Sequence, residues 1–143
     1  MPGVVGPAFI RHEIAVAAPT GTFLGTDARV LLDSFKPGYQ GIVERLRFTT
    51  GPVAGAGAGG TQTFVLRKGG VAGTALATLV VALADTSVGK YLETAVAAAD
   101  DQAARFSDTD TLSLTRTVSG TAYTTEPAGT FHISVREQPQ KRI

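Results

Sequence analysis

The sequence predicts an all-β domain, an antiparallel β-sandwich or jelly roll of seven or eight short strands with extended terminal arms. Two observations predict this class. Apolar residues alternate with polar ones at the period of a half-buried strand, and Gly, Pro and Asp turn signals separate the alternating runs. The 143 residues also include 17 Gly and 7 Pro but no Cys or Trp. This composition is typical of short strands and frequent turns.

Six of the expected strands rest on alternation alone, and the clearest of them lies near the C-terminus. Their apolar positions, in chain order, are Ile10, Ile14 and Val16; Val30 and Leu32; Ile42, Leu46 and Phe48; Phe64 and Leu66; Leu112, Leu114 and Val118; and Phe131, Ile133 and Val135. In the fifth strand, Arg116 interrupts the apolar side, and Ser113 and Thr115 form the polar side. We expect a seventh strand, Thr74 to Leu83, to be buried on both sides because apolar residues occupy both.

The segment 91–106 fits two structures. Leu92, Val96, Ala99, Ala103 and Phe106 fall at helical spacing in an alanine-rich run. The stretch 91–98 also alternates acceptably, and two aspartates interrupt the helical stripe with turn-favouring residues. We favour a strand at 91–98 followed by one helical turn near 100–105, with a helix as the alternative.

One sandwich domain is expected at residues 8–136, between an N-terminal arm at 1–7 and a C-terminal tail at 137–143. The formal net charge of +1 is far from the concentrated positive field that nucleic-acid binding requires. No apolar run approaches the ~18 residues of a membrane span, and the N-terminus lacks the features of a signal peptide. The sequence therefore predicts a soluble chain without a nucleic-acid or membrane partner.

A glycine-rich run, Gly55-Ala-Gly57-Ala-Gly-Gly60, matches the dinucleotide-binding fingerprint. A phosphate site needs a helix directly after the glycines, whereas the following segment is β-branched and alternating. We therefore expect a hairpin loop here. Ser119 lacks the sequence context of a hydrolase nucleophile, and no nucleophile and base pair stands out. We predict that the protein is not an enzyme and binds no cofactor.

Metal-ligand patterns are equally weak. The chain has two histidines, His12 and His132, too few for a multi-histidine zinc site. We expect His12 to be a half-buried strand residue and His132 to be solvated. The aspartates at 100, 101, 108 and 110 miss the spacing of a calcium-binding loop. We predict solvated loop carboxylates and no metal site.

Candidate partner-binding residues come from two features. Arg45, Arg47 and Arg67 lie on expected strands, where an outward cationic row would dock an acidic partner; the alternative is that they only protect the strands from edge pairing. The N-terminal arm cannot form a helix around its prolines, and we expect it to lie extended across a neighbour through Val4, Val5 and Phe9.

Four segments together suggest a family. They are Gly41-Ile-Val-Glu-Arg-Leu-Arg-Phe48, Thr61-Gln-Thr-Phe-Val-Leu-Arg-Lys68, Asp108-Thr-Asp-Thr-Leu-Ser-Leu114 and Gly129-Thr-Phe-His-Ile-Ser-Val135. In their style of strand and loop, over residues 40–136, they resemble the jelly-roll or β-sandwich head decoration (cement) proteins of tailed bacteriophages. No family motif fixes the capsid-binding positions.

The resemblance implies a structural virion protein, made in the host cytoplasm and placed on the capsid exterior. Such a protein bridges major capsid protein subunits and acts as a homo-oligomer, here a trimer. A thin core also favours association, because part of the stability then comes from the interface. The alternative is a phage tail or head-fibre module with a receptor-binding or glycan-binding role, although glycan platforms favour Trp and Tyr and only Tyr39, Tyr91 and Tyr123 are present.

Overall fold

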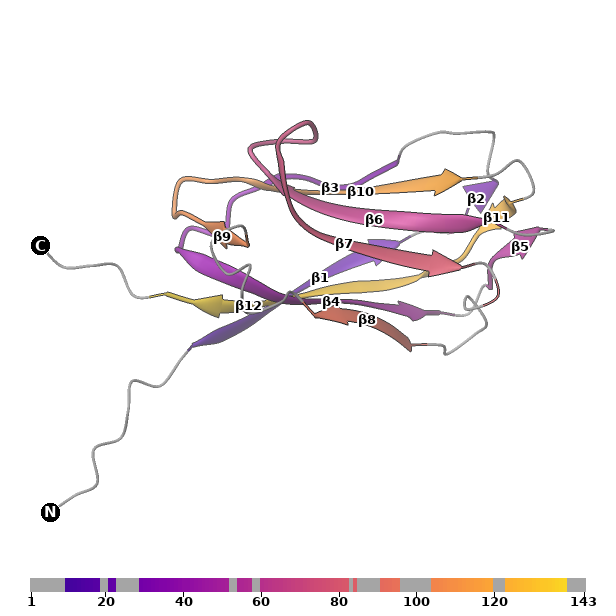
Figure 1. Ribbon diagram of the computed structural model, residues 1–143, viewed down its shortest axis with the longest axis horizontal. Coiled ribbons are helices and arrows are strands. Elements are labelled where there is room, and N and C mark those ends of the chain that lie inside the picture. Colours follow the sequence, from indigo (N-terminus) through magenta and orange to yellow (C-terminus); the bar gives the residue numbers. More distant parts are fainter. Residues whose placement is uncertain are drawn as a thin grey trace, which may run out of the picture.

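The protein is a two-layer antiparallel β-sandwich in the computed structural model (Figure 1), which confirms the predicted all-β class. The structure describes residues 10–18, 21–22, 29–51, 54–57, 60–82, 84, 91–95, 104–119 and 123–138. Its strands are β1 (Arg11–Ala18), β2 (Gly21–Thr22), β3 (Arg29–Phe35), β4 (Gly41–Thr50), β5 (Ala56–Gly57), β6 (Thr61–Lys68), β7 (Thr74–Ala82), β8 (Tyr91–Ala95), β9 (Arg105–Phe106), β10 (Leu112–Ser119), β11 (Tyr123–Glu126) and β12 (Gly129–Glu137).

The layers are two antiparallel sheets whose inner faces pack together. The first layer has the order β1-β12-β4-β8, with β9 pairing with the opposite end of β4, and the second has the order β3-β10-β6-β7. A small sheet, β2-β11-β5, lies at the end of the sandwich away from the start of β1 and the end of β12 (Figure 1). None of the described residues belongs to a helix long and apolar enough to cross a membrane.

The core lies between the two layers and is centred on three phenylalanines. Phe64 of β6 contacts Phe48 of β4 and Phe131 of β12, with ring centroids 5.0 and 4.9 Å apart. All three rings are fully buried, and tilted aromatic pairs at this separation add to the free energy of burial. The three contacting strands come from both layers, so this cluster fastens the sheets to each other.

The eight longer strands coincide with the eight that alternation predicts. The ambiguous segment forms a strand at Tyr91–Ala95, because pairing with β4 overrides its helical spacing. Residues 96–103 lie outside the described part of the chain. The helical turn expected near 100–105 does not extend to Arg105, which pairs with Ile42 in β9. The short strands β2, β5, β9 and β11 were not expected, since two to four residues carry too little periodicity.

Strand β7 corrects the expectation of a strand buried on both sides. It is an edge strand with one inner face, and Val80 on its outer face is 59% exposed. Leu76 and Leu79 are both buried although three residues apart, because the β6–β7 register shifts at Leu76, which has no opposite residue in β6. A bulge of this kind changes which residues point inward, and alternation alone does not reveal it.

Strand β10 differs from expectation on both faces. Ser113 and Thr115 of its expected polar side are buried, because the backbone N–H of Ser34 donates to Ser113 Oγ and Arg67 donates to Thr115 Oγ1. Arg116, which interrupts the apolar side of this strand, has a fully buried side chain. Its Nη1 donates to the Pro127 carbonyl at 3.4 Å. A charged residue at an apolar position is therefore accommodated inside the sandwich.

Gln62 supplies a test of the core. Its side chain is fully buried on the inner face of β6, and neither polar atom of its amide has a hydrogen-bond partner. Because a buried unpaired polar group costs about 1–3 kcal/mol, we expect Gln62→Met, which keeps the shape, to raise the free energy of unfolding by about 1 kcal/mol.

Urea denaturation followed by circular dichroism would measure the effect of Gln62→Met. Gln40→Met, at a half-buried position, is the matched control and should change the free energy of unfolding by less than about 0.5 kcal/mol. A loss of stability in Gln62→Met alone would mean that the amide is satisfied in solution.

Candidate functional site

The outer face of the first layer presents Arg45 and Arg47. Strand β4 alternates, so that Leu46 and Phe48 point into the core while Arg45 and Arg47 point outward. The β4–β12 register shifts next to Glu44, which has no opposite residue in β12. This bulge places Glu44 and Arg45 side by side on the outer face.

Ion pairs connect β1 with β4 across the intervening strand β12 on this face. Arg11 Nε of β1 lies 3.3 Å from Glu44 Oε1 of β4. Arg47 forms an ion pair with Glu13 of β1, and Ser134 Oγ of β12 donates to the same carboxylate. Exposed pairs of this kind contribute little stability each, and their main effect is to order the arginine side chains.

A hollow of about 260 Å³ opens on the same face and is lined by Arg11, Glu44, Arg45 and Ser134. We call this surface the arginine face: the outer side chains of β1, β12 and β4 around the hollow. Its described charged groups are four arginines, at positions 11, 45, 47 and 136, and two carboxylates, at positions 13 and 44. The surface therefore has an excess of positive charge.

Arg67 does not belong to this surface, which corrects the expectation of one row with Arg45 and Arg47. It lies on β6 in the second layer, on the opposite outer face of the sandwich. Its Nη1 donates to Thr115 Oγ1 at 3.0 Å, so it covers the neighbouring strand β10. The other expected partner-binding residues, Val4, Val5 and Phe9, lie outside the described residues.

The histidines lie on different sides of the first layer. His12 is half-buried, as expected, and is the second residue of β1. Its Nε2 donates to Glu137 Oε2 at 2.7 Å, and its ring stacks on Tyr39 with centroids 4.1 Å apart. His132 lies on the outer face opposite Arg47 and is half-buried rather than solvated.

Tyr39 packs between His12 and Phe106, and its ring centroid lies 6.0 Å from that of Phe106. We call His12, Tyr39, Phe106 and Glu137 the terminal cluster. Burial raises the pKa of the Tyr39 hydroxyl above its ordinary value of 10.0, and the negative charge of Glu137 raises it further. A ring enclosed on two sides is a poor platform for a sugar. The side chains of Tyr91 and Tyr123, the other tyrosines relevant to glycan binding, are outside the described part of the structure.

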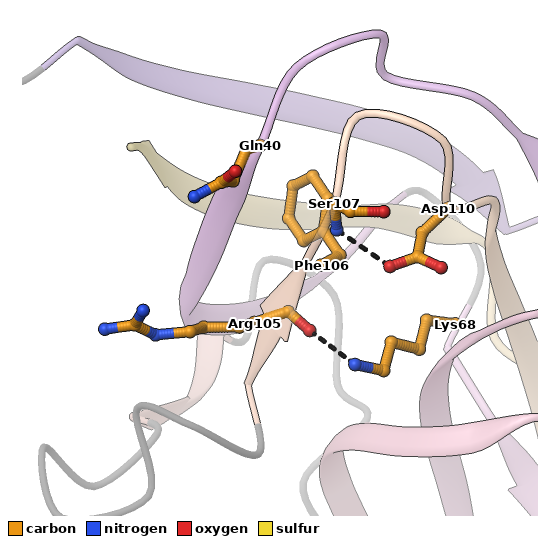
Figure 2. Close-up of a pocket in the computed structure, with 6 residues that line it drawn as sticks. All are labelled: Gln40, Lys68, Arg105, Phe106, Ser107 and Asp110. Carbon is orange, nitrogen blue, oxygen red and sulfur yellow. Dashed lines mark hydrogen bonds between the residues drawn. The ribbon is translucent and has the colours of Figure 1, made fainter. Parts of the chain in front are cut away.

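A second hollow, of about 240 Å³, lies beside this cluster and is lined by Gln40, Lys68, Arg105, Phe106, Ser107 and Asp110 (Figure 2). Its polar groups are mostly engaged within the protein. Lys68 Nζ donates to the Arg105 carbonyl at 2.9 Å, and the Ser107 backbone N–H donates to Asp110 Oδ2 at 2.7 Å. Figure 2 shows the Arg105 guanidinium pointing away from Lys68. These hydrogen bonds hold β9 and the turn that follows it in place.

The glycine-rich run is followed directly by strand β6, as expected, although Ala56 and Gly57 within it form β5 rather than a simple loop. Asp110 caps a turn instead of being only solvated. No group of three His, Asp or Glu side chains suited to a metal ion occurs among the described residues.

The terminal cluster and both hollows were not predicted from the sequence. His12 and Glu137 are 125 residues apart in the chain, and only the β1–β12 pairing brings them together. The bulge next to Glu44 has no local sequence signal either. The one usable signal was the density of arginines in β4.

Comparison with known proteins does not assign the chain to a family. No family model and no curated protein sequence matches the chain. Among solved structures, the chain is similar to one described under the heading "Bacillus endospore appendages form a novel family of disulfide-linked pili", with a TM-score of 0.43 and 17% sequence identity. The similarity covers 92% of this chain and 89% of that chain.

The raised pKa of Tyr39 predicts how stability depends on pH. The unfolded tyrosine loses its proton near its ordinary pKa of 10.0, while the folded one holds the proton to higher pH. The unfolded state then binds fewer protons than the native state, so the free energy of unfolding falls as the pH rises above about 10.

Tyr39→Phe should lessen this decrease, and urea denaturation between pH 8 and pH 11 would measure it. Glu137→Gln should also lessen it, by a smaller amount, because Glu137 is the lesser cause of the shift. A decrease of the same size in Tyr39→Phe as in the unchanged protein would assign the pH dependence to other groups.

Proposed function

We propose that this protein is a structural virion protein that decorates and stabilises a phage head. In this proposal it lies on the capsid exterior, bridges subunits of the major capsid protein and acts through its binding surface alone. The arginine face contacts an acidic patch on the capsid. The homotrimer expected from the sequence remains a prediction.

The observation that carries the proposal is the excess of arginine on one rigid face. The arginine face carries four arginines and two carboxylates. Two of these arginines, Arg11 and Arg45, line the hollow of about 260 Å³ together with Glu44 and Ser134. Arginine is favoured at protein interfaces because its planar guanidinium binds carboxylates in a bidentate manner. A concave, net-positive surface therefore fits an acidic protein surface, with a protruding carboxylate placed in the hollow.

The positions of these arginines are fixed before binding. Arg45 and Arg47 project from the middle of β4, which pairs with β12 on one side and β8 on the other. The inner face of β4 is held by Leu46 and Phe48, both fully buried. Because little ordering is needed on binding, more of the contact energy is available for attachment.

Loss of the central arginine charges should weaken attachment to capsids. We expect the double variant Arg45→Gln, Arg47→Gln to raise the dissociation constant for heads by about tenfold, equal to the loss of about 1.4 kcal/mol. Co-sedimentation with empty heads, assembled from the major capsid protein encoded in the same genome, would measure it. Attachment of the unchanged protein should also weaken with added salt, which screens exposed charges.

Arg67→Gln is the matched control because it removes the same charge from the opposite face. It should leave the dissociation constant within about twofold, provided that circular dichroism shows an intact fold. An equal effect of the two changes would place the contact elsewhere. Failure of the unchanged protein to bind heads at any concentration would refute the capsid proposal.

A further inference from the structure

The four edge strands of the two layers differ in their protection against pairing with another chain. Exposed edges are usually protected by charged residues, Pro or bulges. Strand β1 has Arg11, His12 and Glu13, strand β3 has Arg29 and Asp33, and strand β8 has Glu93. Strand β7, Thr-Ala-Leu-Ala-Thr-Leu-Val-Val-Ala, has no charged residue and no Pro.

The second half of β7 has regular strand geometry. Its one register shift against β6 lies before Ala77, and Thr78 to Ala82 pair in continuous register with Thr61 to Val65. Val80, in the middle of this stretch, is 59% exposed. Five regular residues therefore form an uncharged edge, a suitable template for a further strand.

We propose that β7 pairs with β7 of a second copy of this chain, antiparallel, about a two-fold axis that passes next to Val80. The two second layers then form one continuous sheet across the dimer. Pairing of this kind is isologous, since the same patch is used by both copies.

The register of this pairing is consistent with both faces of the sheet. With Val80 opposite its own copy, Leu79 lies opposite Val81 and Thr78 lies opposite Ala82. Leu79 and Val81 are the buried residues of this stretch, whereas Thr78 and Val80 are exposed. Residues directly opposite each other share a face, so the buried residues Leu79 and Val81 meet each other, and the outer-face residues Thr78, Val80 and half-buried Ala82 meet each other.

Charge favours a second copy as the occupant. The formal net charge of +1 gives no strong repulsion between copies, and no like charges meet in the proposed register. Beside β7, the outward residues Thr63 and Val65 of β6 are also uncharged.

The first test is self-association of the purified chain, which does not depend on the proposed capsid function. Sedimentation equilibrium should show a monomer–dimer equilibrium, and this result would exclude the homotrimer expected from the sequence. Val80→Lys places two like charges opposite each other and should raise the dimer dissociation constant by at least about tenfold. Val30→Lys is the matched control, because Val30 is a 51% exposed valine on the opposite edge strand of the same layer; it should leave that constant unchanged.

The second test uses the absence of cysteine from the chain. Directly opposite residues of an antiparallel pair lie within the Cα separation that a disulfide spans. Val80→Cys should therefore form a covalent dimer under mild oxidation at least about tenfold faster than Val30→Cys, because association holds the two thiols together.

Four results would overturn the proposal, and the first three concern unmixed samples. They are a monomer mass at all concentrations, equal cross-linking rates for the two cysteine variants, and a larger oligomer that Val80→Lys leaves intact. Faster cross-linking in a mixture of Val80→Cys with Val30→Cys than in Val80→Cys alone would also overturn it, since it indicates pairing of β7 with β3 of the next copy.

Discussion

The packing of Phe64 against Phe48 and Phe131 is the contact on which the other features depend. It fastens the two sheets at their centre, and it fixes which face of each of three strands points inward. Because strand residues alternate between faces, the positions of Arg45 and Arg47 on the outside follow from the burial of Phe48. The arginine face is in this sense a consequence of the core.

Bulges then change which residues face inward or outward in the pattern that alternation predicts. The bulge at Glu44 brings an acidic and a basic residue together on the arginine face. The shift in β7 turns Leu76 inward and leaves a regular edge after it. A third irregularity, between β10 and β3, coincides with a positive φ of 52° at Ser34, whose backbone N–H donates to Ser113. Each irregularity determines a surface that regular pairing would not produce.

The two layers present outer faces of different character. The arginine face is charged and partly cross-linked by ion pairs, whereas β6 and β7 present mainly Thr, Val and Ala. A charged, concave face suits a partner of opposite charge, and a neutral edge suits a copy of itself. The two proposed contacts use different layers, so neither proposed contact would exclude the other.

The sequence by itself determined the all-β class and the location of seven of the eight longer strands, because the period of two is a local property of the chain. For the eighth, β8, it favoured a strand but left a helix open as the alternative. It also identified Arg45 and Arg47 as outward residues. Tertiary structure decided that Arg67 lies on the opposite face, that Arg116 is buried and that His12 meets Glu137. Strand order, bulges and layer assignment depend on contacts between distant residues, and alternation within one strand contains no information about its neighbours.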